Sequence, residues 1–260
     1  CHESMIDAET KFCDEHDIVL SGWIRVRGKV PSSPLSSCKH ELTCSSGRGG
    51  RAGITPLPSK SEIAPLLCCF FDIECISETD RFPDASQVGD RIVQIGVHFW
   101  RVGSPREESA RVLLTLGECD PIDGVRIDRC SSESSLLTRF RELVTVEADP
   151  DVFLTYNGSG FDWRYLVDRS LLLGAKDFLF LGRIPLLPAR TREKKLASSA
   201  LGSNDLFLVD CEGRYHIDLF QYVKAGTKLR SYKLDSVAEH FLGERKVDLP
   251  PKELFRLARE

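Results

Sequence analysis

The sequence predicts an α/β domain in which a mixed five-stranded sheet is flanked by helices, preceded by part of a smaller β-rich domain. Two observations support this prediction. From residue 63 onward, apolar segments with strand character alternate with segments of helical periodicity. Before them, residues 31–60 are rich in Ser, Gly and Pro, a composition typical of a loop or linker. We therefore divide the chain into residues 1–62 and residues 63–260.

Strand signals come first along the chain. Residues 18–20 and 23–26 have β character and belong to the small first part. Residues 66–75 form a near-continuous apolar run, the pattern of a strand buried on both faces. Residues 91–100 and 112–116 are expected to be the second and third strands of the main sheet, the former with its alternate apolar side chains on one side.

Helices and strands alternate after these three strands. The remaining elements are expected to be an amphipathic helix at 131–146, a strand at 152–156, a helix at 161–173 ended by Gly174, a strand at 215–219, and helices at 234–242 and 252–259. A run of three strands followed by alternating helices and strands is the element order of the ribonuclease H-like fold. Fold analogy of this kind does not give the function.

Composition sets broad limits on function. The net charge is 35 − 39 = −4, which gives no global sign of nucleic-acid binding, although a local basic groove would suffice. Two basic stretches, residues 183–195 and 224–233, could form such a groove or be solvated loops. No apolar run approaches the about 20 residues of a membrane span, so we expect no membrane partner. No signal peptide opens the sequence, so we expect an intracellular protein. Ten cysteines without a C-x-x-C pair indicate reduced thiols.

Two carboxylates lie at alternate positions of the first buried strand. Side chains of a strand alternate between its faces, so Asp72 and Glu74 should point one way while Phe71 and Ile73 point into a core. Adjacent acids repel each other unless a cation lies between them, and Mg²⁺ and Mn²⁺ prefer oxygen ligands. The alternative is a pair of solvated carboxylates where the strand meets its loop.

A third acid, Asp162, begins the helix that follows the fourth strand. An aspartate there could simply stabilise the helix through its dipole. In the fold described above, however, the strands before Asp72 and Asp162 are parallel neighbours, so their carboxyl ends meet at one place. The preceding Asn-Gly-Ser-Gly loop allows close approach of the backbone to a ligand. We therefore predict that the three carboxylates converge on cations.

Several segments resemble family B DNA polymerases. Residues 71–75 (FDIEC) and 156–162 (YNGSGFD) resemble the first and second exonuclease motifs of that family. Residues 82–97 are similar to the segment that follows the first motif. Residues 213–249 are similar to the stretch before the third motif in delta-type and large-DNA-virus enzymes. Residues 2–26 resemble part of the N-terminal domain of the same enzymes. The resemblance thus touches most of the chain.

The resemblance implies roles for particular residues. Asp72, Glu74 and Asp162 would be the catalytic and metal-binding carboxylates of a proofreading 3′–5′ exonuclease that uses two Mg²⁺ or Mn²⁺ ions. Phe82 would pack against the terminal base of a frayed primer, and Asn157 and Phe161 would bind the substrate strand. The alternatives are a Phe82 folded onto the core and an Asn157 that is only a turn residue.

The chain departs from the family at the third motif, Tyr-x-x-x-Asp, which carries a fourth carboxylate. No Tyr-x-x-x-Asp sequence follows residues 213–249, the segment that resembles the stretch before this motif. Tyr232 and Asp235 do not form the motif, because they are three residues apart and the motif needs four. We therefore expect a fragment that is weak or inactive alone. The implied partners are a DNA primer-template with a single-stranded 3′ end and, through regions outside the fragment, a sliding clamp and accessory subunits. The implied location is a nucleus or a viral replication site.

Two other functions remain open at this stage. One is a stand-alone exonuclease of the same fold, and the other is a non-catalytic scaffold domain that has kept the fold.

Overall fold

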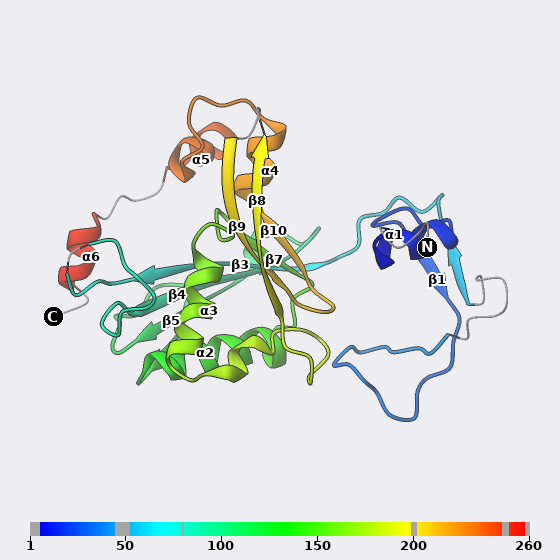
Figure 1. Ribbon diagram of the computed structural model, residues 1–260, viewed down its shortest axis with the longest axis horizontal. Helices are drawn as coiled ribbons and strands as arrows, with labels where there is room; N and C mark the ends of the chain where they lie inside the picture. The colour runs from blue at the N-terminus through cyan, green and yellow to red at the C-terminus, as the bar shows by residue number, and fades with distance from the viewer. Residues whose placement is uncertain (1–5, 45–52, 80, 199–201, 246–249, 258–260) are drawn as a thin grey trace. The chain divides into compact units, whose positions relative to one another are not determined.

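The computed structural model describes residues 6–44, 53–79, 81–198, 202–245 and 250–257. The chain divides into two compact units, Cys1–Ala64 and Pro65–Glu260 (Figure 1). Each cysteine within the described ranges is a free thiol. Of the helices within the same ranges, none is both long and apolar enough to cross a bilayer.

The first unit contains one helix and a short strand pair. Helix α1 (Ala8–Glu15) begins after Asp7, whose side chain accepts a hydrogen bond from the Thr10 backbone N–H (2.9 Å). Strands β1 (Ile24–Val26) and β2 (Ile54–Pro56) form an antiparallel pair. Strand β1 lies where β character was predicted, at residues 23–26. The strand predicted at 18–20 was wrong: these residues follow α1 in a turn, and Val19 and Leu20 are exposed. A three-residue apolar run is too short to specify a strand.

The second unit is built on a six-stranded mixed sheet of order β10-β7-β3-β4-β5-β6. The β3–β4 and β4–β5 pairs are antiparallel, and the other three pairs are parallel. The predicted α/β fold class is therefore confirmed, with one strand more than the five expected. The additional strand is β6, whose sequence RIDRC is too polar to signal a strand. The strands are β3 (Leu67–Cys75), β4 (Ile92–Arg101), β5 (Ala110–Leu116), β6 (Arg126–Cys130), β7 (Val152–Thr155) and β10 (Tyr215–Asp218).

Two helices cover one face of this sheet. Helix α2 (Glu133–Glu142) starts with a capping box between Ser132 and Ser135, and a π-helical turn, Leu143–Glu147, continues it. Helix α3 (Asp162–Leu172) follows β7, and Gly174 after it has a left-handed φ of 69°. The apolar side chains of both helices join those of β3, β4 and β7 in a single core.

Other elements surround this framework (Figure 1). The β8–β9 hairpin and α4 were not predicted. Strand β8 takes up part of the basic stretch 183–195, for which a groove and a solvated loop were both open, and its Arg192 pairs with Asp210 of β9. Phe255 of α6 packs against Ile76 and Val93. The elements are β8 (Arg190–Ser198), β9 (Gly202–Asp210), α4 (Leu219–Gly226), α5 (Leu234–Leu242), α6 (Pro251–Leu257) and the 3₁₀ turns Arg106–Glu108 and Lys176–Leu179.

The two faces of β3 differ in burial. Phe71 and Ile73, each 5% exposed, lie on the face that α2 and α3 cover. Asp72 on the opposite face is exposed, and Phe70 and Glu74 beside it are half-buried. The predicted alternation is therefore confirmed, whereas the expectation of a strand buried on both faces was wrong. An apolar run does not by itself show that a second layer covers it.

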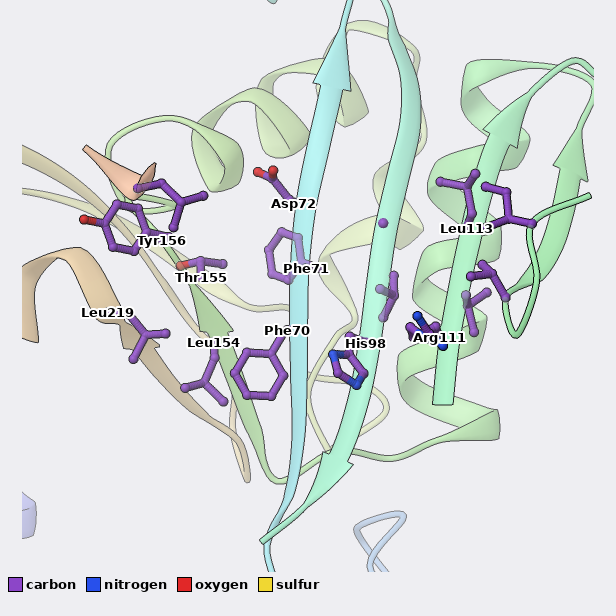
Figure 2. A pocket seen from close by; sticks show the side chains of 16 residues that line it. Phe70, Phe71, Asp72, His98, Arg111, Leu113, Leu154, Thr155, Tyr156 and Leu219 are labelled. Carbon is purple, nitrogen blue, oxygen red and sulfur yellow. The ribbon is translucent and has the colours of Figure 1, made fainter. Parts of the chain in front are cut away.

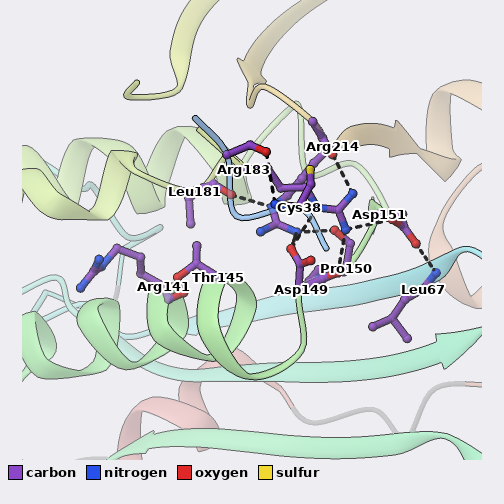
Figure 3. A network of polar contacts seen from close by, with 12 residues as sticks. Cys38, Leu67, Arg141, Thr145, Asp149, Pro150, Asp151, Leu181, Arg183 and Arg214 are labelled. Carbon is purple, nitrogen blue, oxygen red and sulfur yellow. Dashed lines mark hydrogen bonds and ion pairs between the residues drawn. The ribbon is translucent and has the colours of Figure 1, made fainter. Parts of the chain in front are cut away.

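A polar network fastens the amino-terminal ends of β7 and β10 (Figure 3). Arg183 donates to the carboxylates of Asp149 (3.0 Å) and Asp151 (2.9 Å), and the other Asp151 oxygen accepts from the Leu67 backbone N–H (2.8 Å). Arg214 forms an ion pair with Asp149 (2.9 Å) and donates to the Leu181 carbonyl (2.7 Å). The network therefore ties β3, β7 and the start of β10 together at the sheet end opposite Asp72.

His216 makes the stability of the fold depend on pH. Its ring lies 5.0 Å from that of Phe153 and 4.9 Å from that of Trp163, and neither buried ring nitrogen has a hydrogen-bond partner among the described residues. Burial lowers the pKa of His216 to about 4. Below the ordinary histidine pKa of about 6.5, the unfolded chain binds a proton that the folded chain excludes. Stability should therefore fall from about pH 6.5 down to about pH 4.

The measurement is urea unfolding at pH 5 and pH 7. His216→Phe keeps an aromatic ring in this cluster and should remove up to about 1.4 kcal/mol per pH unit from the slope. An unchanged slope in that variant would show that His216 is not the titrating group.

Candidate active site

The structure brings Asp72 and Asp162 together. Strands β3 and β7 are parallel neighbours, with Phe70 opposite Leu154, as predicted. The chain leaves β7 through residues 156–161 and enters α3, so Asp162 returns to the end of β3. Asp162 shares a hydrogen bond with the Asp72 side chain, and its Oδ1 accepts from the Ile73 backbone N–H (3.3 Å).

Burial changes the protonation of Asp162. Asp162 is 5% exposed, and burial together with the nearby Asp72 charge raises its pKa far above the usual range. A second negative charge beside Asp72 is costly in such a place, so Asp162 holds its proton more tightly unless a cation neutralises the charge. The oxygen-only donor set fits a hard divalent ion such as Mg²⁺ or Mn²⁺.

Glu74 is not gathered with the other two acids. It lies on the same face of β3 as Asp72, two residues further along. Within the described ranges, no three side chains of His, Cys, Asp or Glu lie close enough to hold a metal ion. The structure thus joins two of the three predicted carboxylates and leaves the third on their side of the sheet.

The loop between β7 and α3 is held in place by hydrogen bonds to Asp218, the last residue of β10. Asn157 has a left-handed φ of 64°, in line with the turn alternative. A Cβ at Gly158 would lie 2.4 Å from the Thr155 hydroxyl, so only glycine fits there. The two carboxylate oxygens of Asp218 accept hydrogen bonds from the backbone N–H groups of Asn157 (2.8 Å) and Ser159 (3.0 Å).

Asp218 is a site residue that the sequence reasoning missed. It is also the N-cap of α4, because its side chain accepts from the Phe220 N–H (3.0 Å). An aspartate directly before an apolar segment of helical periodicity is an N-cap signal and could have indicated α4. Its bonds to the loop 61 residues earlier in the chain carry no such signal.

Two aromatic rings stand beside Asp162. Phe82 is 77% exposed, so it is not folded onto the core, which was the alternative to a substrate contact. Its ring meets that of Phe161 edge-on at 5.3 Å, and Phe161 directly precedes α3 and Asp162. Phe161 is itself partly buried against the core, so the exposed Phe82 ring is the one of the two that is free to stack with a planar ligand.

A groove of about 470 Å³ opens on the sheet face that carries Asp72 (Figure 2). Phe70 and Leu154 form its floor beside Asp72, His98 projects from β4, and Tyr156 directly follows β7 (Figure 2). Tyr156 is fixed because its hydroxyl donates to the Tyr232 carbonyl (2.5 Å). A ligand that reaches Asp72 from this side therefore contacts apolar and aromatic surface.

Comparison with known proteins agrees with this geometry. Residues 1–237 match the family described as DNA polymerase family B, exonuclease domain. The DNA polymerase delta catalytic subunits of Candida albicans and Drosophila melanogaster are 33% and 34% identical over 87% and 95% of this chain. DNA polymerase 120R of Invertebrate iridescent virus 3 is 34% identical over 95% of it.

The alignments cover only part of each relative. They span 22% of the C. albicans protein, 23% of the D. melanogaster protein and 22% of the viral one. The family match covers most of this chain, and its region contains the sheet, the two joined carboxylates and the aromatic pair. The chain belongs to the family B DNA polymerases and covers their exonuclease domain.

Proposed function

We propose that this chain is the proofreading part of a replicative DNA polymerase and removes mispaired nucleotides from primer 3′ ends. The observation that carries the proposal is the contact between Asp72 and the buried Asp162, whose pKa burial and the Asp72 charge raise. Such a pair is costly in a folded protein unless a cation uses it. The family membership makes phosphodiester hydrolysis the chemistry to expect.

We assign two divalent ions, Mg²⁺ or Mn²⁺, to this end of the sheet. Asp72, Glu74 and Asp162 would be the residues that hold them. When bound, such ions stabilise the negative charge that develops on phosphoryl oxygens and help to ionise a water molecule. The protein's own part is to hold the carboxylates in place. Strand β3 positions Asp72 and Glu74, and the loop that is hydrogen-bonded to Asp218 positions Asp162.

Substrate selection would depend on the state of the primer end. A mispaired end frays more readily than a paired one, and only a single strand would reach Asp72 between the aromatic pair and the groove. Phe82 and Phe161 would stack on the terminal base, and Asn157 would contact the strand. Stacking on aromatic side chains is typically worth about 1–3 kcal/mol per base. The sliding clamp, the accessory subunits and a nuclear or viral replication site belong to the same proposal.

One observation favours a second candidate, a non-catalytic scaffold. In the part of the chain that the structure describes, Glu74 does not join Asp72 and Asp162 in a cluster of three ligands. Mn²⁺ titration distinguishes the candidates, because a site for two ions saturates at two per protein while a scaffold binds no pair. The third candidate, a stand-alone exonuclease, requires a full-length protein without polymerase activity.

The test is hydrolysis of 3′-terminal nucleotides from single-stranded DNA by the full-length protein. We expect cleavage with Mg²⁺ or Mn²⁺ and none with excess EDTA. Mononucleotide release that continues in EDTA would contradict the metal assignment. Absence of cleavage with either ion, in protein that still binds DNA, would support the scaffold.

A further inference from the structure

The loop that joins β3 to β4 carries Phe82 and is closed by one buried side chain. The Asp90 carboxylate, in a residue 5% exposed, accepts from the backbone N–H groups of Glu78 (3.1 Å) and Asp84 (2.9 Å). These two groups lie on either side of Phe82 in the chain. The loop therefore has a fixed base beneath an exposed aromatic ring.

Arg169 of α3 fastens the same loop to that helix. Its guanidinium makes five hydrogen bonds: to the carbonyls of Ala85 (3.1 Å), Gln87 (2.6 Å) and Val88 (3.3 Å), and to the two carboxylate oxygens of Glu133 (2.8 and 2.5 Å). These bonds use all five N–H groups of the arginine. Glu133 Oε1 also accepts from the Ile92 N–H (2.9 Å), at the point where the loop enters β4.

The residues that hold the loop share a face of α3 with the candidate metal ligand. Asp162, Tyr165 and Arg169 follow one another at spacings of three and four, which places them on one side of a helix. The Tyr165 hydroxyl donates to the Asp90 carbonyl (3.0 Å), and the Tyr165 ring lies 5.2 Å from that of Phe161. The helix that brings Asp162 to Asp72 therefore also holds the Phe82 loop in position.

Arg169 and Glu133 form a buried ion pair. Arg169 is 1% exposed and its partner Glu133 is 5% exposed. A buried ion pair is weak evidence for stability, because well-packed apolar residues often serve as well. Its three carbonyl bonds, however, need a planar group with several donors in fixed directions. Lysine has three donors on one freely rotating nitrogen and cannot reproduce this geometry.

We propose that Arg169, supported by Glu133, is a positioning residue of the exonuclease site. It holds the Phe82 loop on α3 so that the Phe82–Phe161 ring pair stays beside Asp72 and Asp162 and receives the terminal base of the substrate. The inference rests on the proposed function. Because Arg169 acts through Phe82, it governs capture of the 3′ end and has little part in hydrolysis.

The experiment uses the full-length protein and a fluorescently labelled single-stranded oligonucleotide. Its dissociation constant is measured by anisotropy in EDTA, and kcat and KM for cleavage are measured with Mg²⁺. Arg169→Lys should weaken binding and raise KM about tenfold, which corresponds to loss of one base-stacking contact, with kcat within about twofold of wild type. Wild-type affinity in Arg169→Lys would overturn the inference.

A second substitution separates positioning from general destabilisation. Since Arg169 acts through Phe82, adding Arg169→Lys to Phe82→Ala should weaken binding no further than Phe82→Ala alone. If the two losses multiply, Arg169 does not act through Phe82. Tyr165→Phe removes only the hydroxyl hydrogen bond to the Asp90 carbonyl and should give a smaller loss of DNA affinity. If Arg169→Lys does not fold, Tyr165→Phe takes its place as the test variant.

The matched control is Arg214→Lys. Arg214 is also buried, donates to carbonyl oxygens and pairs with a carboxylate, but at the opposite end of the sheet. It should leave DNA affinity and KM unchanged, and an equal loss there would overturn the inference. Failure of the proposed function looks different, because the wild-type protein itself would then show no metal-dependent cleavage.

Discussion

Replacing Asp72 and Glu74 together by Ala is expected to abolish 3′-terminal hydrolysis of single-stranded DNA by the full-length protein. Asp72 is in contact with Asp162, and Glu74 shares the face of β3 with Asp72. Removing both carboxylates leaves Asp162 as the last of the three predicted ligands. Metal ions contribute several kcal/mol of transition-state stabilisation, so the rate should fall at least about a thousandfold.

The measurement is the initial rate of mononucleotide release at saturating Mg²⁺. Glu118→Ala is a suitable control, because the Glu118 side chain is 94% exposed and lies in the turn after β5. The double variant should still fold, since Asp72 is exposed and Glu74 half-buried. Full activity in the double variant would end the proposed mechanism.

Trp163→Ala is expected to have the largest effect on stability. Trp163 is 3% exposed, and its ring lies 4.8 Å from that of Phe71 and 5.5 Å from that of Phe153, so it anchors α3 on strands β3 and β7. Truncation of a buried tryptophan usually costs about 3–5 kcal/mol, because the cavity closes only partly. That is a large share of the about 5–15 kcal/mol by which a domain is stable.

Urea unfolding followed by far-UV circular dichroism measures this loss. Trp163→Phe keeps a ring in the same place and should lose clearly less than the alanine variant. Tyr222→Ala provides a surface control, because Tyr222 is 72% exposed and such changes are usually within about 0.5 kcal/mol. If Trp163→Ala costs no more than Tyr222→Ala, the ring cluster does not hold α3 in place.

Strong local periodicity explains why most of the sheet could be predicted. Strands β3, β4, β5, β7 and β10 and helices α2, α3, α5 and α6 all lie where apolar patterns placed them, within a few residues. Strands β6 and β8 escaped prediction because their sequences are polar and they are strands only through pairing with neighbours. Strand β9 was missed although it carries the apolar run at residues 206–209. Helix α4 escaped because it is short and directly follows a strand.

The site was predictable to the extent that it depends on alternation and topology. A period of two on β3 placed Asp72 and Glu74 on one face, and the parallel pairing of β3 with β7 placed Asp162 next to Asp72. Whether three carboxylates gather depends on side-chain positions, and the described structure joins only two. The roles of Phe82, Asn157 and Phe161 stay predictions until DNA binding is measured.

The sequence by itself determined which residues lie on which face of β3, and in what order the strongly periodic elements follow, because both depend on neighbours in the chain. Only the tertiary structure decided what holds the site together. Asp218 reaches a loop 61 residues away, and Arg169 reaches Ala85 across 84 residues. Such contacts leave no periodic trace in a sequence, since hydrogen bonding depends on distance in space after folding.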